Sequence, residues 1–130
     1  MNAIKGTMTD PEIRRFLENG EYGILCTAGR DGFPCGTPVN YVFSGGRIYF
    51  HGSGKGEKAV NLAADPRCCF TVARSYGCVA TGSTACNITA SYESVIVKGT
   101  AAPVADPGEK EAVLRAIIGS LTPGRKDLPM

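Results

Sequence analysis

The sequence predicts a mainly β domain, an antiparallel Greek-key-like barrel with flanking helices, and three observations support this fold class. Five segments with the composition of strands follow one another at short spacing. Turn signals such as Asp31-Gly32 and Ser44-Gly45-Gly46 separate them, and helical segments lie between and beside them. The 130 residues, of which 43% are hydrophobic and 20% charged, suit one globular domain spanning residues 1–130.

The strands are predicted as a meander of three followed by two more. They are Tyr22–Ala28, Phe33–Phe43, Arg47–His51, Arg67–Arg74 and Tyr92–Ala102. Pro34 and Pro38 indicate that the second strand is an edge strand or begins irregularly, because proline cannot donate to a sheet ladder. Gly99 is expected to mark a bulge. The segment Tyr76–Thr89 is rich in Gly, Ser, Thr and Ala, and we expect a long loop there.

Three helices are predicted from their end signals. Thr9-Asp10-Pro11-Glu12 combines a capping side chain, an early proline and a Glu at capping-box spacing, and Asn19-Gly20 is a natural end. A short helix is expected over Glu57–Ala64. A last helix follows Asp106-Pro107, and Thr122-Pro123-Gly124 stops it. Residues 1–8 and 123–130 are expected to be loose.

Charge and hydropathy exclude two classes of partner. The net charge of +2 and the pI near 8.2 are too mild for nucleic acid, and no run of five Lys or Arg residues occurs. No apolar run approaches the length of a membrane span, and residues 1–9 carry no signal-peptide segment. We therefore expect a cytoplasmic protein that binds neither nucleic acid nor membrane.

The sequence contains six cysteines but no Cys-x-x-Cys motif. They are Cys26, Cys35, Cys68, Cys69, Cys78 and Cys86. In a cytosolic protein they are expected to stay reduced, and most of them are expected to be small buried hydrophobic residues. Structural zinc sites present ligands in closely spaced pairs, so we expect no metal site.

The segment His51–Lys58, HGSGKGEK, combines three glycines and two lysines between a strand end and a helix start. Free backbone N–H groups and the helix dipole favour an anion there, and Lys58 lies in the first helical turn, where a phosphate would bind. The alternative is a plain connection, with glycines for flexibility and lysines for solubility. The Walker pattern is not matched.

His51 is the single histidine of the chain and directly precedes the glycines. An imidazole at this place could hydrogen-bond a ligand or donate a proton. The alternative is a histidine that hydrogen-bonds the backbone and only shapes the loop.

Several segments, in this order, resemble the pyridoxamine 5'-phosphate oxidase-like family, and in particular its nitroimidazole-reductase branch. They are Gly23-Ile24-Leu25-Cys26-Thr27, Asp31-Gly32-Phe33-Pro34, Thr37-Pro38-Val39-Asn40-Tyr41-Val42, Ile48-Tyr49-Phe50-His51-Gly52-Ser53 with Gly56, Lys58 and Leu62, Asp65-Pro66, Arg67–Val72, Ala85-Cys86-Asn87 and Tyr92–Gly99. The resemblance covers residues 8–122. It implies a split β-barrel homodimer that holds two FMN molecules at the dimer interface.

The resemblance also implies a set of site residues. Phosphate contacts would come from Ser53 and Lys58, with Gly52 and Gly56 in the same loop. Contacts to the flavin ring would come from Pro38, Val39, Asn40 and Tyr41, and His51 would face the active site. Tyr92 and Ser94 would reach across from the partner subunit. The additional arginines with which the family's oxidases hold their substrate phosphate are not evident, so we expect a different substrate.

The leading functional hypothesis is an FMN-dependent oxidoreductase that reduces a small electrophile, such as a nitroaromatic compound, with His51 as the catalytic residue. Its electrons would come from a nicotinamide or a protein donor. The first alternative is a flavin-binding carrier, store or sensor without catalysis, and the second is a heme-binding relative. Cys86 is either a redox thiol near the flavin or a structural loop cysteine.

Overall fold

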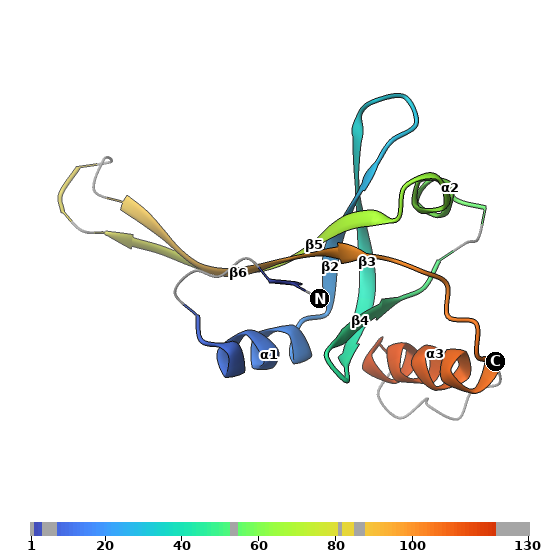
Figure 1. The fold of residues 1–130 in the computed structure, drawn as a ribbon. Helices are drawn as coiled ribbons and strands as arrows, with labels where there is room; N and C mark the ends of the chain where they lie inside the picture. Colours follow the sequence, from blue (N-terminus) through green and yellow to red (C-terminus); the bar gives the residue numbers. More distant parts are fainter. Residues whose placement is uncertain (1, 4–7, 53–54, 81, 85–87, 122–130) are drawn as a thin grey trace.

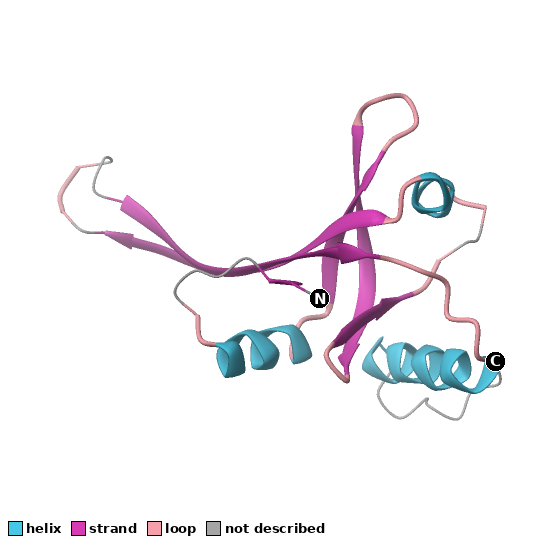
Figure 2. Ribbon diagram, viewed as in Figure 1, coloured by secondary structure: helices cyan, strands magenta, loops and turns pink. Residues whose placement is uncertain are grey.

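A curled antiparallel sheet and three helices make up the computed structural model (Figures 1 and 2), which describes residues 2–3, 8–52, 55–80, 82–84 and 88–121. The strands are β1 (Asn2–Ala3), β2 (Tyr22–Ala28), β3 (Pro34–Ser44), β4 (Arg47–Phe50), β5 (Arg67–Ala80) and β6 (Ile88–Thr100). Their order in the sheet is β1-β6-β5-β2-β3-β4, so β5 returns to pair with β2 and not with β4. The predicted mainly β architecture with flanking helices is confirmed.

The three helices begin and end where the capping residues indicate. They are α1 (Asp10–Glu18), α2 (Glu57–Ala64) and α3 (Pro107–Leu121). The predicted capping box of α1 is present: the Glu12 N–H donates to the Thr9 hydroxyl, and the Thr9 N–H donates to the Glu12 carboxylate. These bonds use donors that a helix start otherwise leaves unpaired.

The hydrophobic core lies on one face of the sheet, beneath α1. Its buried members are Ile13, Leu17, Leu25, Val39, Tyr41, Phe70, Val72, Val95 and Val97. Tyr41 and Phe70 meet edge to face, with their ring centroids 5.0 Å apart. Along β2 every second residue is buried, and of these residues Leu25 belongs to the hydrophobic core.

The segment predicted as a loop, Tyr76–Thr89, forms strands at both of its ends, over residues 76–80 and 88–89. Cys78 pairs with Ala90, and the pairing continues to Ala80 and Ile88. The resulting β5–β6 arm projects from the body of the molecule (Figure 1). The prediction was wrong because backbone pairing between two adjacent strands stabilises an arm even where small residues dominate the sequence.

The predicted bulge at Gly99 was also wrong, since Gly99 pairs with Cys68 in continuous register. The irregularity lies instead between Ser75 and Cys78, where Gly77 has a φ of +94°. A φ in that region strains other L-residues and suits glycine.

The two prolines of β3 lie where that strand has one neighbour. Pro38 pairs with Ile24 of β2, whereas β4 joins β3 only from Tyr41 onward. The expectation of an edge is therefore confirmed for the first half of β3.

Residues 1–8 were expected to be loose, but two of them form a strand. Asn2 and Ala3 form β1, which pairs with Lys98 and Val97 of β6, because the open edge of β6 offers backbone partners to residues of any side chain. Residues 4–7 and 122–130 lie outside the described part of the chain.

Candidate functional site

The predicted cofactor residues of β3 and of the glycine loop meet where β4 ends. Tyr41 pairs with Phe50, the last residue of β4. His51 follows directly, one residue beyond this last pair of the ladder. The chain then passes through Gly52 toward α2, so three segments that are separate in the sequence converge at this corner of the sheet.

Gly52 and Lys58 are in close contact. A side-chain carbon built on Gly52 would lie 2.6 Å from Cε of Lys58 and nearer still to its ammonium nitrogen. The lysine side chain therefore folds back from the first turn of α2 over the Gly52 backbone. This places a positive charge against the glycine loop, in space that any larger residue at position 52 would occupy.

The N-terminus of α2 faces this corner without a side-chain cap. Gly56 is its N-cap residue, and a glycine has no side chain to accept from the N–H groups of the first turn. Such N–H groups and the helix dipole attract an anion. Lys58 adds a full charge beside them.

A buried hydrogen bond holds α2 in place. Nδ2 of Asn61 donates to the hydroxyl of Thr27 over 3.1 Å, and both side chains are almost fully buried. Leu62 packs against the core from the same helix. The position of the helix start relative to β2 is therefore fixed by contacts on the opposite side of the helix from solvent.

The four predicted residues of β3 divide between the two faces of the strand. Val39 and Tyr41 are buried in the core, whereas Pro38 is exposed and Asn40 is half-buried. Asn40 donates through Nδ2 to the backbone oxygen of Glu21 over 3.2 Å. Only Pro38 and Asn40 have side chains directed away from the core, so any contact of Val39 or Tyr41 with a cofactor would be made by the backbone.

Both the ring and the hydroxyl group of Tyr41 make contacts within the core. The hydroxyl donates to the backbone oxygen of Leu17 over 2.6 Å. Burial raises the pKa of this phenol to about 12, and the positive charge of Arg74 offsets part of the shift. The sequence analysis did not anticipate this role, because nothing in the local pattern indicates a hydrogen bond to the end of α1.

The other predicted site residues lie in three different situations. His51 is exposed, one residue beyond the end of β4. Ser53 lies outside the described residues, as does Cys86. Tyr92 and Ser94 lie on β6, three strands away from β3 in the same sheet, a distance of about 14 Å at ordinary strand spacing. They do not join the cluster within one chain.

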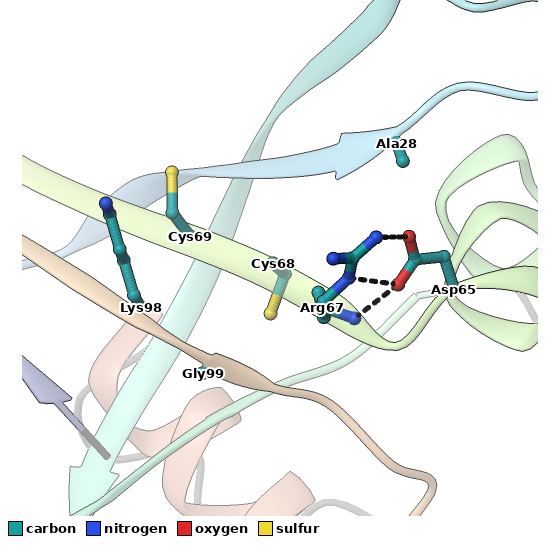
Figure 3. A pocket seen from close by; sticks show the side chains of 7 residues that line it. All are labelled: Ala28, Asp65, Arg67, Cys68, Cys69, Lys98 and Gly99. Carbon is teal, nitrogen blue, oxygen red and sulfur yellow. Dashed lines mark hydrogen bonds and ion pairs between the residues drawn. The ribbon is translucent and has the colours of Figure 1, made fainter.

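A cavity of about 450 Å³ at the other end of the sheet was not predicted (Figure 3). It is lined by Ala28, Asp65, Arg67, Cys68, Cys69, Lys98 and Gly99. The Arg67 guanidinium forms two hydrogen bonds to the Asp65 carboxylate, of 3.0 and 2.8 Å, and lowers the pKa of that carboxyl to about 2. Sequence reasoning missed this cavity because its lining comes from β2, β5, β6 and the end of α2.

Two further observations concern the described residues alone. No helix among them is both long enough and apolar enough to cross a membrane. Within the same ranges, no group of three or more His, Cys, Asp or Glu side chains is arranged to hold a metal ion.

Solved structures with the same fold include three that cover most of this chain. A conserved hypothetical protein from Mycobacterium tuberculosis is 29% identical, with a TM-score of 0.72 over 89% of this chain and 66% of its own. A flavocytochrome from Azotobacter vinelandii is 26% identical, with a TM-score of 0.80 over 94% of this chain and 56% of its own. The chain thus spans less than two thirds of the length of either protein.

The third is a protein from Bacteroides thetaiotaomicron, named as a candidate for 5-nitroimidazole antibiotic resistance. It is 19% identical, with a TM-score of 0.78 over 95% of this chain and 72% of its own, and this likeness shows the fold alone. A comparison with curated proteins gave no match.

The sequence itself matches one protein family along nearly its whole length. The match runs from residue 9 to residue 130 and so includes all three helices and every strand except β1. The curled sheet agrees with the fold expected from the sequence. The chain belongs to the pyridoxamine 5'-phosphate oxidase family.

Proposed function

We propose that the protein binds FMN at the corner where β4 ends and uses it to reduce a small electrophile, such as a nitroaromatic compound. The observation that carries the proposal is the contact of Lys58 with Gly52 beside the uncapped start of α2. A terminal phosphate fits this corner because backbone N–H groups, the helix dipole and an ammonium group converge there.

Some residues of the chain would bind the cofactor, and others would take part in the reaction. Lys58 and the first-turn N–H groups of α2 would bind the phosphate, and Ser53 would add a hydroxyl group. Pro38, Asn40 and the backbone of β3 would orient the flavin ring, which supplies the electron-transfer chemistry when bound. His51 is exposed one residue beyond the end of β4, where its ring nitrogen could hold and deliver the proton that the reduced substrate takes up.

A homodimer would complete this site. Tyr92 and Ser94 pair with Ser75 and Ala73 of β5, beyond Thr71, the last residue of β5 that pairs with β2, where β5 and β6 continue into the arm. Tyr76 and Tyr92 are 53% and 67% exposed on this arm, and exposed aromatic residues are typical of protein interfaces. An arm that reaches a second copy would supply these residues from the partner.

The flavocytochrome among the similar structures supports a redox cofactor, and its name also keeps a heme-binding alternative open. A flavin carrier or sensor without turnover is the remaining alternative. The absorption spectrum of the purified protein separates flavin from heme, because heme gives a Soret band. Anaerobic turnover of a nitroimidazole with a nicotinamide donor separates an enzyme from a carrier.

Titration with FMN and with riboflavin tests the phosphate site directly. FMN is expected to bind much more tightly, and equal affinity for both ligands would remove the argument. Lys58→Ala should weaken FMN binding about 10- to 100-fold, the equivalent of the roughly 1.5–3 kcal/mol of a hydrogen bond to a charged group. Its riboflavin affinity should not change.

Lys55→Ala is the matched control, since it removes the same charge from the same loop. If Lys55→Ala loses FMN affinity and Lys58→Ala keeps it, the phosphate has been assigned to the wrong lysine. Circular dichroism of each variant shows whether the fold is retained.

A further inference from the structure

A row of four residues crosses the sheet on the face opposite the core. Gly36 of β3 pairs with Cys26 of β2, Cys26 pairs with Cys69 of β5, and Cys69 pairs with Lys98 of β6. Their neighbours Leu25, Phe70 and Val97 alternate with them and point into the core, so the four residues of the row share the outer face.

Cys26 and Cys69 stand directly opposite each other in this row. Residues paired in an antiparallel ladder have their Cα atoms about 4.5–5.5 Å apart. That interval lies within the roughly 4.4–6.8 Å that a disulfide spans. The backbone therefore already holds the two Cα atoms at a separation that a disulfide can span.

No other pair among the five described cysteines has this relationship. Cys68 and Cys35 both flank Thr27, one on each side, so a whole strand lies between them. Cys78 pairs with Ala90 on the β5–β6 arm. The structure therefore distinguishes one thiol pair from its sequence neighbours, which the spacing of cysteines along the chain could not do.

The surroundings of the pair leave it accessible to a small oxidant. Both thiols are half-buried, and Cys69 lines the 450 Å³ cavity. Gly36 has no side chain to cover Cys26. Figure 3 shows Cys69 and Lys98 pointing to the same side of the sheet and Cys68 to the other. A cation beside a cysteine is a feature of reactive thiol sites.

We propose that Cys26 and Cys69 are a redox-active dithiol that a hydroperoxide oxidises to a cross-strand disulfide. The Cys69 sulfur attacks one peroxide oxygen, the O–O bond breaks, and the other oxygen leaves with a proton as water or an alcohol. Cys69 is then a sulfenic acid. The Cys26 sulfur attacks the Cys69 sulfur, the S–O bond breaks, and the hydroxyl leaves with the Cys26 proton as water. The two sulfurs lose two electrons and the peroxide gains them.

The order of the two thiols follows from their environments. Burial raises the pKa of the Cys26 thiol, and the neighbouring Cys69 and Cys35 thiols raise it further. Cys26 therefore keeps its proton until the second step. Cys69 faces the cavity and Lys98, and so meets the oxidant first. The reaction needs no flavin and does not depend on the function proposed above.

Peptide mapping after peroxide treatment tests the proposal on the intact protein. Tryptic cleavage gives residues 16–30, which contain Cys26 alone, and residues 68–74, which contain Cys68 and Cys69. Mass spectrometry under non-reducing conditions should find these two peptides joined, with the loss of two hydrogens. A dithiol reductant should separate them again.

Two serine variants assign the bond to one sulfur. Cys68→Ser should keep the cross-link and Cys69→Ser should lose it, although the two positions are adjacent in the sequence. Lys98→Met should slow cross-link formation severalfold. The proposal is overturned if Cys69→Ser still joins the two peptides. It is equally overturned if peroxide converts Cys69 to sulfinic acid while Cys26 stays a free thiol.

Discussion

Replacing Gly52 by alanine tests the corner at the end of β4 without removing any charge. The added carbon would lie 2.6 Å from Cε of Lys58, whereas unbonded carbons prefer about 3.5–4.0 Å. The lysine must therefore move by about 1 Å or more. Because the displaced atoms are the far end of a flexible side chain, the free energy of unfolding should change by no more than about 0.5 kcal/mol.

The affinity for FMN should fall much more than the stability. If the displaced ammonium can no longer reach the phosphate, binding loses about 1.5–3 kcal/mol, which is roughly 10- to 100-fold in Kd. Fluorescence titration measures this change. Gly99→Ala is the matched control, because a carbon built on Gly99 meets nothing within 4 Å.

A double-mutant cycle shows whether Gly52 acts through Lys58. If it does, the double variant should bind FMN about as weakly as Lys58→Ala alone, because the contact between the two residues has already been lost. Fully additive effects would mean that the methyl group blocks the cofactor by itself. Wild-type FMN affinity in Gly52→Ala would refute the assignment of this corner as the phosphate site.

Five further outcomes are expected from the residues described above. Tyr41→Phe removes the shorter of two hydrogen bonds that the Leu17 oxygen accepts, the other coming from the Gly20 N–H over 3.4 Å, and should lower the free energy of unfolding by about 0.5–1.5 kcal/mol in urea. Because burial raises the Tyr41 pKa to about 12, its contribution to stability is full below about pH 10 and is lost as the pH rises toward 12, and Tyr41→Phe should remove that loss. Asn61→Ala removes the donor to the buried Thr27 hydroxyl and should lower the free energy of unfolding by about 1–3 kcal/mol in the same urea assay. An unchanged urea midpoint would show that this hydrogen bond does not hold α2 in place. His51→Ala and His51→Gln should keep FMN but lose turnover by about 10²-fold or more; normal turnover would make His51 structural, and loss of FMN would make it a binding residue. Light scattering should give twice the 13.6 kDa chain mass, and a strict monomer that binds FMN would contradict the dimer.

Local signals were sufficient for most elements of the fold. The bounds of β2 and α2 agree with the sequence prediction, because a turn or a capping signal stands at each of their ends. The capping box at Thr9 likewise depends on only four consecutive residues. Such features depend only on neighbours in the sequence, so a single chain reveals them.

What the sequence could not reveal depends on partners from distant strands. The β5–β6 arm is stable through pairing of two segments that each have weak strand composition. Tyr41 was expected near a cofactor, yet its hydroxyl group ends at the backbone of α1. The pairing of Cys26 with Cys69 follows from the register of β2 on β5, which no pattern within either strand specifies.

The strand order has a consequence for how the chain reaches its native state. The β2–β3 and β5–β6 pairs each join strands that are consecutive in the sequence, so they can form early as local hairpins. The β2–β5 seam joins the two hairpins, and it can close only after β3, β4 and α2 have been gathered into a loop between them. Closing that loop costs more entropy than closing either hairpin, which makes the meeting of Leu25 with Phe70 the expected slow step. Substitutions along this seam should therefore slow folding.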